Sequence, residues 1–216
     1  MKGDILKIKP YHTAAARAAF ALLADEIAPA AGRFVVAVGG ESGSGKSEIA
    51  AELARLAAED GLSSLILQQD DYFRLPPQTN ARRRREDFEW VGPGEVRLDL
   101  LDEHLRLAHD PAVAEIEKPL SLFEEDTLAS ETVSLEGVKL VIVEGTYTAS
   151  LSHADRRLFL TRDYRATAAA RAERGREAQD DFLERVLARE HEFIAPLREK
   201  ADFLIDDDYS VTAVEK

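Results

Sequence analysis

The sequence contains no cysteine, a single asparagine and no long apolar run. Without cysteine the chain can form neither a disulfide framework nor a cysteine-ligated zinc site. No apolar stretch approaches the ~20 residues that span a bilayer. The N-terminal MKGDILKIKP carries charge on both sides of a very short apolar stretch, which is unlike a signal peptide. These absences predict a cytoplasmic protein that does not work in a membrane.

Positive charge is outnumbered, because 28 Lys and Arg residues stand against 41 Asp and Glu residues, a net charge of −13 at pH 7. A chain this acidic repels nucleic acid, so no nucleic-acid partner is expected. The length of 216 residues suits one domain, 1–216, with a sizeable core. No internal repeat or low-complexity linker divides it. The sequence leaves open whether the chain forms a homo-oligomer.

One stretch, GESGSGKS at residues 40–47, fits the phosphate-binding pattern G-x-x-x-x-G-K-[ST] at every fixed position. In such a loop the glycines let backbone N–H groups point at phosphate oxygens, and the following helix presents its N-terminus to the same anion. Lys46 is predicted to reach the β- and γ-phosphates, and Ser47 to place its hydroxyl on Mg²⁺. The predicted nucleotide-binding residues, with ATP or GTP as donor, are Gly40, Glu41, Ser42, Gly43, Ser44, Gly45, Lys46, Ser47 and Glu48.

Apolar runs that alternate with helical periods predict an α/β fold with a parallel sheet and helices on both faces. The predicted strands are 34–39, 64–68, 139–143, a segment near 157–160 and 201–205, with short ones near 114–116 and 132–135. The predicted helices lie within 1–31 and at 48–60, 94–108, 164–174 and 181–192. The stretch 72–93 shows no clear period and several breakers, so we expect a long functional loop there.

Acidic residues follow two of the predicted strands, where ligands of open α/β sheets bind. Glu144 follows the run 141–143 and is placed to hold magnesium; the alternative is a strand-end acid that pairs with an arginine. Asp70 follows the second strand and is placed to accept the proton of an attacking hydroxyl. It could instead cap a turn, in which case Asp71 is the second candidate.

Arginines gather in two places. The first group, within 162–180, either folds over the phosphates or forms a solvated helix face. The second, residues 82–85, is either solvated or contacts an anionic acceptor, and Arg84 is its candidate for substrate contact. The arginines of the first group are Arg165, Arg171, Arg174 and Arg176.

Two aromatic residues follow the second group. Phe88 and Trp90 either stack on a substrate ring or pack in the core.

Five motifs in order, GESGSGKS, LQQDDYF, VIVEGTY, AERGR and FIAPLREKADFLID, resemble the uridine kinase and phosphoribulokinase superfamily of P-loop kinases over about residues 34–206. The resemblance implies a P-loop NTPase three-layer sandwich with a five-stranded parallel sheet, and a small helical lid at about 162–180. It also implies a small-molecule hydroxyl acceptor. The residues to which it assigns roles are Asp70 as catalytic carboxylate, Glu144 as magnesium ligand, Arg171, Arg174 and Arg176 as lid arginines, and Tyr72 and Phe73 in the acceptor pocket.

Two departures leave the acceptor open. Residues 119–126, PLSLFEED, lack the tyrosine and histidine with which uridine kinases contact the nucleoside, and the helix within 1–31 is an addition. The chain also lacks the N-K-x-D signature of a GTPase switch, since its one asparagine is Asn80, and the L-S-G-G-Q segment of a transporter ATPase. A phosphorylated or acidic acceptor, and a regulatory nucleotide-binding protein without turnover, remain as alternatives.

Overall fold

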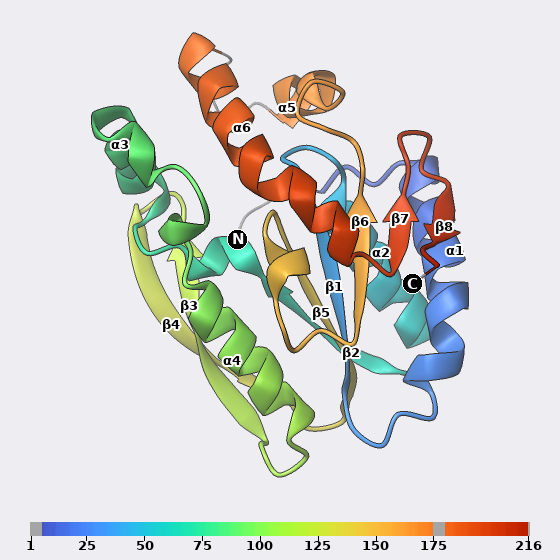
Figure 1. Ribbon diagram of the computed structural model, residues 1–216. Coiled ribbons are helices and arrows are strands. Elements are labelled where there is room, and N and C mark those ends of the chain that lie inside the picture. Colours follow the sequence, from blue (N-terminus) through green and yellow to red (C-terminus); the bar gives the residue numbers. More distant parts are fainter. Residues whose placement is uncertain (1–5, 175–179, 216) are drawn as a thin grey trace.

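The computed structural model describes residues 6–174 and 180–215. Within these residues the central sheet has six strands in the order β2-β5-β1-β6-β7-β8 (Figure 1). The first five are parallel, and β8 pairs antiparallel with β7. These strands are β1 (Phe34–Gly40), β2 (Ser63–Gln68), β5 (Val138–Gly145), β6 (Arg156–Leu160), β7 (Phe203–Ile205) and β8 (Val211–Ala213). The predicted five-stranded parallel sheet is therefore confirmed, with β8 as an additional edge strand.

Helices cover both faces of this sheet and make three layers. The α-helices are α1 (Pro10–Ile27), α2 (Lys46–Glu59), α3 (Pro77–Glu86), α4 (Leu98–His109), α5 (Ala168–Arg174) and α6 (Asp181–Ile194). The short 3-10 turns are η1 (Gln69–Tyr72), η2 (Phe88–Trp90), η3 (Pro93–Glu95), η4 (Thr148–Ser150) and η5 (Ala195–Lys200). No helix among the described residues is both long and apolar enough to cross a membrane.

Strand β1 explains why the core has two halves. Its residues are all buried, and successive side chains point to opposite faces. Val36 and Val38 join the cluster formed with α1 and α2, whereas Val35 and Ala37 join the cluster formed with α4. A strand buried on both faces is continuously apolar, as parallel strands usually are.

The stretch 72–93 is the main difference from the predicted fold. Its lack of a clear period and its several breakers predict a long functional loop, but ten residues of it form α3, and Pro77 is the first residue of that helix. A proline there costs nothing, because the first N–H of a helix has no partner in any case. The helix carries almost no apolar residues, so no apolar period marks it in the sequence.

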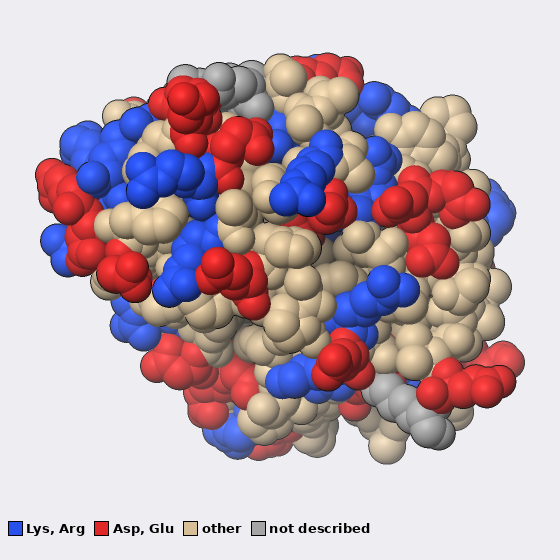
Figure 2. All heavy atoms as spheres, turned by 45° about the horizontal axis from the view of Figure 1, so that its top comes forward, with Lys and Arg blue, Asp and Glu red and all other residues tan. Residues whose placement is uncertain are grey.

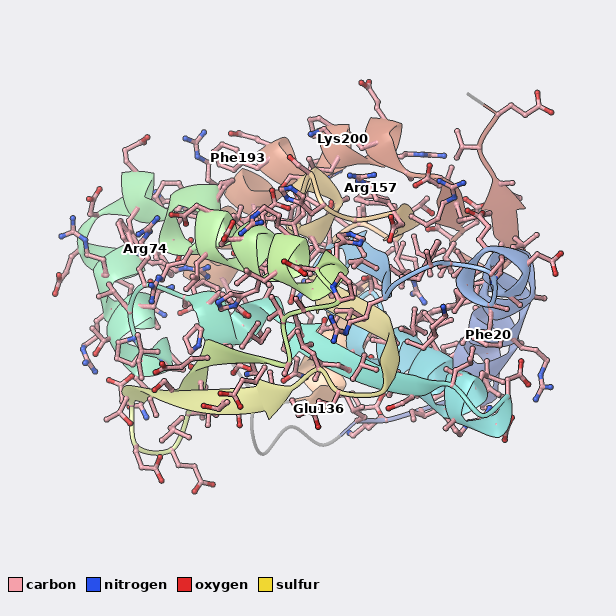
Figure 3. All side chains as sticks on the ribbon, turned by 90° about the horizontal axis from the view of Figure 1, so that it is seen from below. Phe20, Arg74, Glu136, Arg157, Phe193 and Lys200 are labelled. Atoms are coloured by element: carbon pink, nitrogen blue, oxygen red, sulfur yellow. The ribbon has the colours of Figure 1, made fainter. Side chains whose placement is uncertain are left out.

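A separate two-stranded antiparallel sheet lies beside the main one. It pairs β3 (Glu115–Leu122) with β4 (Thr127–Ser134), which are longer than the two short strands expected there. Viewed from below, Phe20 on α1 and Arg74 just after η1 lie on opposite sides of the molecule (Figure 3). Helix α1 and the acceptor-side segment that begins after η1 are therefore separated by the body of the sheet.

Candidate active site

The phosphate-binding loop joins β1 to α2 at the carboxyl edge of the sheet. Gly43 and Gly45 have φ values of +78° and +106°, a left-handed conformation that glycine adopts without strain. Gly45 is the N-cap of α2, so that helix opens directly onto the loop. A Cβ at Gly43 would come within 2.7 Å of Arg171 Cγ. The loop therefore needs glycine at this position both for its backbone and for its contact with α5.

Lys46 is buried in the loop, and its Nζ donates a hydrogen bond to the backbone oxygen of Glu41 at 2.8 Å. The Glu41 side chain lies away from this cradle: its carboxylate accepts from the backbone N–H of Tyr164 and pairs with His191 on α6. Sequence reasoning placed Glu41 among the nucleotide ligands. In the structure its carboxylate instead ties the loop to α6 and to the segment before α5, a contact between residues 150 positions apart that no local pattern reveals.

Glu144 and Asp70 converge because β2 and β5 are neighbours, with Gln68 paired to Glu144 in register. Glu144 is almost fully buried. The pKa of Glu144 is raised from 4.5 to about 7, chiefly by burial and also by the charge of Asp70, whereas Lys46 and a hydrogen bond with Ser47 act in the opposite direction. Two carboxylates and a hydroxyl beside a phosphate cradle form a donor set that Mg²⁺ accepts, because Mg²⁺ takes one or two carboxylates and completes its shell with phosphates and water.

Asp70 and Asp71, adjacent in sequence, have different surroundings. Asp71 is 3% exposed, its carboxylate pairs with Lys118 Nζ at 2.8 Å, and it accepts from the backbone N–H of Ser121. Asp71 thus anchors the β3–β4 sheet. Asp70 instead faces a cavity of about 530 Å³. The two alternatives left open by the sequence are therefore distinguished by what each carboxylate contacts.

The large cavity lies between α3 and α6 and ends at Asp70, Ser42 and Thr146 beside the phosphate-binding loop. Its wall combines aromatic side chains with charged ones. Of the residues predicted to contact nucleotide or substrate, Ser42, Asp70, Phe73, Arg84 and Arg171 line it. Residues that sequence reasoning did not single out also line it, namely Gln78, Asn80, Phe123, Asp180, Phe182 and Glu190.

The arginines of α3 are paired with carboxylates around this cavity. Arg84 is largely buried and bridges Glu95 at 2.6 Å and Glu190 at 2.9 Å. Arg85 pairs with Asp180 at 2.9 Å. Arg82 pairs with Asp126 at 3.2 Å, at the tip of the β3–β4 sheet. Figure 2, in which the top of Figure 1 comes forward, shows Lys and Arg interleaved with Asp and Glu rather than gathered by sign.

Two predicted acceptor residues do not reach the cavity. Tyr72 is fully buried in the core, where its hydroxyl bonds His104 Nδ1 at 2.8 Å and burial raises its pKa well above the usual range. Trp90 is partly buried, and its ring N–H donates to Asn80 Oδ1 at 2.8 Å. Trp90 therefore supports Asn80, which does line the cavity, instead of lining it itself.

The lid segment places Arg171 against the phosphate-binding loop. Its guanidinium is buried and donates to the backbone oxygen of Tyr164 and to Thr167 Oγ1, and it lies 3.5 Å from Glu184. Thr167 in turn donates to the backbone oxygen of Ser42. The Arg174 side chain and Arg176 lie outside the described residues, so their predicted roles stay predictions.

Comparison with known proteins agrees with this geometry. The model of the phosphoribulokinase / uridine kinase family matches residues 35–211. A uridine kinase of Leuconostoc citreum is 28% identical over 186 residues, which cover 80% of this chain and 87% of that protein. A bifunctional alpha-galactosidase/sucrose kinase of Mediterraneibacter gnavus is 26% identical over 193 residues, 83% of this chain and 20% of that protein.

Among solved structures, D-glycerate 3-kinase of Cryptococcus neoformans superposes with a TM-score of 0.63 at 15% identity. The superposition covers 95% of this chain and 100% of that structure, so the two share a fold. The five motifs, the loop geometry and the family match concur. The chain therefore belongs to the phosphoribulokinase / uridine kinase family, and it is an ATP-dependent phosphotransferase that acts on a hydroxyl group of a small molecule.

Proposed function

We propose that this protein transfers the γ-phosphoryl group of Mg²⁺-ATP to a hydroxyl of an uncharged, polyhydroxylated small molecule. The observation that carries the proposal is the position of Asp70: it lies on the wall of the large cavity and close enough to Glu144 to shift its pKa. An acceptor in that cavity would meet the γ-phosphate where Asp70 can take its proton.

Each residue then has one task. Lys46 and the backbone of residues 40–47 hold the phosphates, while Ser47 and Glu144 hold the Mg²⁺ that neutralises their charge. Asp70 orients the acceptor hydroxyl and accepts its proton as the acceptor oxygen bonds the γ-phosphorus and the bond to the β-phosphate oxygen breaks. Arg171, with Arg174 and Arg176 from the lid, is proposed to stabilise charge on the transferring group.

The charge balance of the cavity supports an uncharged acceptor. Each α3 arginine on the wall already faces a carboxylate, and these partners include Glu190 on α6 and Asp180, the N-cap residue just before α6. A phosphorylated acceptor would have to displace these partners. Hydroxyl groups, by contrast, accept from arginine and donate to carboxylate, and the faces of Phe73, Phe123 and Phe182 suit the apolar side of a sugar or nucleoside.

The test is ADP release with Mg²⁺ and ATP across three groups of acceptors. The uncharged group contains uridine, cytidine, fructose and sucrose, the acidic group D-glycerate and pantothenate, and the phosphorylated group ribulose 5-phosphate. We expect stimulation by the uncharged group alone, and its loss in Asp70→Asn. Stimulation by ribulose 5-phosphate would overturn the proposal that the acceptor is uncharged. Tight ATP binding without turnover on any acceptor would favour a regulatory protein.

A further inference from the structure

A second cavity, of about 190 Å³, lies on the other side of the phosphate-binding loop. Residues of that loop and of α2, Gly43, Gly45 and Glu48, form its floor. The large cavity touches the loop at Ser42 instead. Helix α5 separates the two cavities. Arg171 faces the large one, whereas Ala169, Ala170 and Glu173 of this helix, with Ala166 just before it, face the small one.

The orientation of a bound nucleotide follows from this arrangement and rests on the function proposed above. The γ-phosphate must point toward Asp70 and Glu144, because the acceptor lies there. The three phosphates occupy the loop around Lys46. The nucleoside end must therefore leave the loop away from Asp70, on the side where the small cavity opens beside Gly43 and Gly45.

The walls of the small cavity suit an aromatic base. Tyr11 and Tyr209 stack with ring centroids 4.4 Å apart, and the Arg162 guanidinium lies 5.3 Å from the centre of the Tyr209 ring. The opposite wall consists of alanines of α5. A cavity lined by aromatic rings and alanines, with charged side chains such as Arg162 and Glu48 also on its wall, can hold a base by stacking, with little dependence on which base it is.

The aromatic wall is tied to the phosphate-binding loop. The Tyr209 hydroxyl donates to the backbone oxygen of Ser44 at 3.0 Å and lies 3.3 Å from His12 Nε2. Tyr209 has a φ of +65°, an unusual conformation for a tyrosine, and this conformation belongs to the turn that presents its ring. His12 Nε2 is also the nearest atom, at 3.0 Å, to a Cβ placed on Gly45.

We propose that α1 and the residues just before it form part of the donor site, with Tyr11 and His12 covering the purine base of ATP. Both residues lie outside residues 35–211, the range that matches the family model. Lys7 and Lys9 hold this segment against α5 through Glu173, at 3.4 and 3.1 Å. An addition to the family domain thus supplies a wall that helps to retain the donor.

The test separates the base from the phosphates by comparing two probes, ADP and inorganic tripolyphosphate, in calorimetric titrations with Mg²⁺ and no acceptor. Tyr11→Ala removes one wall; Tyr11 is 38% exposed, so the variant is expected to fold. Because a stacking contact with the base is lost, we expect ADP to bind roughly tenfold more weakly, which is about 1.4 kcal/mol. Binding of tripolyphosphate should not change.

Three further variants make the result decisive. Ala169→Leu fills the cavity from α5 and should also weaken ADP alone. Leu22→Ala, at an exposed position farther along α1, is the matched control and should change neither probe. Lys46→Ala should weaken both. The inference is overturned if Tyr11→Ala weakens the binding of ADP and tripolyphosphate equally, or if it leaves the affinity for ADP unchanged. It is also overturned if the wild type binds ADP no more tightly than tripolyphosphate. These titrations contain no acceptor, so they test the donor site separately from phosphoryl transfer. A failure of the proposed transfer would therefore not change their outcome.

Discussion

At the scale of single residues, neighbouring carboxylates in this site differ in what surrounds them. Asp71 is neutralised by Lys118, which also contacts Glu131 at 2.8 Å, whereas Asp70 faces the cavity. The sequence could not separate the two, because Lys118 lies 47 positions away and no local pattern marks the pair. The same holds for Tyr72 and Phe73, of which only the second reaches the cavity.

This difference predicts opposite phenotypes for two matched substitutions. Asp70→Asn should keep ATP affinity and thermal stability but lower kcat by orders of magnitude, because the proton acceptor is lost. Asp71→Asn should keep much of the activity per folded molecule but lose roughly 1–3 kcal/mol of unfolding free energy, since Lys118 loses a charged partner. Steady-state kinetics and urea unfolding of both variants check this. Near-normal turnover in Asp70→Asn would transfer the role to Asp71 or to water.

The raised pKa of Glu144 predicts a pH-dependent cost to stability. Between its ordinary value of 4.5 and about 7, the folded protein keeps a proton that the unfolded chain has released. The free energy of unfolding therefore falls as pH rises through this window and levels off above it. Without magnesium, Glu144→Gln should be more stable than the wild type at pH 8 by up to about 3 kcal/mol, and nearly equal at pH 5.

Thermal unfolding at both pH values, with and without Mg²⁺, measures this difference. Magnesium favours the ionised carboxylate, so it should stabilise the wild type at pH 8 and have less effect on Glu144→Gln. If Glu144→Gln is less stable than the wild type at pH 8 in the absence of Mg²⁺, then Glu144 is not the source of the pH-dependent loss of stability.

At the scale of elements, helix α3 is held in place mainly by ion pairs, whereas helices such as α4 are held by apolar contacts. Arg84 joins α3 to η3 through Glu95, which is fully buried, and to α6 through Glu190. Asn80 also donates to Glu95. The strands and the amphipathic helices α4 and α6 could be predicted because their apolar residues recur with the right period. Helix α3 could not, since its partners come from distant parts of the chain.

Two arginines of α3 provide a matched comparison. Arg84→Ala removes the cation that pairs with the buried Glu95 and the partly buried Glu190, and should lower the unfolding free energy by roughly 3–5 kcal/mol. It should also raise the acceptor KM, because α3 and α6 form the cavity walls. Arg83→Ala removes an exposed pair with Asp87 and a contact of the guanidinium 5.7 Å from the centre of the Trp90 ring, and should cost about 1 kcal/mol or less. Denaturant unfolding of both variants decides; similar losses would mean that the buried network does not hold α3.

At the scale of the whole molecule, the site is assembled from segments that span most of the chain. The carboxyl edge of the sheet could be predicted to carry it, since 40–47, Asp70 and Glu144 each follow a predicted strand. The structure adds that these strands are neighbours. The pairing of His12 with Tyr209, 197 positions apart, could not be predicted, because it depends on how α1 packs against β8 and α2.

Helix α5 has only seven residues, yet its opposite faces border both cavities. Selection for a new acceptor, whether in nature or in directed evolution, would therefore change a helix that also borders the proposed nucleotide site. A bulkier residue on α5 that changes the shape of one cavity also changes the other. Variants of α5 with improved turnover of a new acceptor would therefore also have an altered affinity for the nucleotide. Libraries that vary α3 and α6 while leaving α5 intact would avoid this trade-off, because those helices border the large cavity alone.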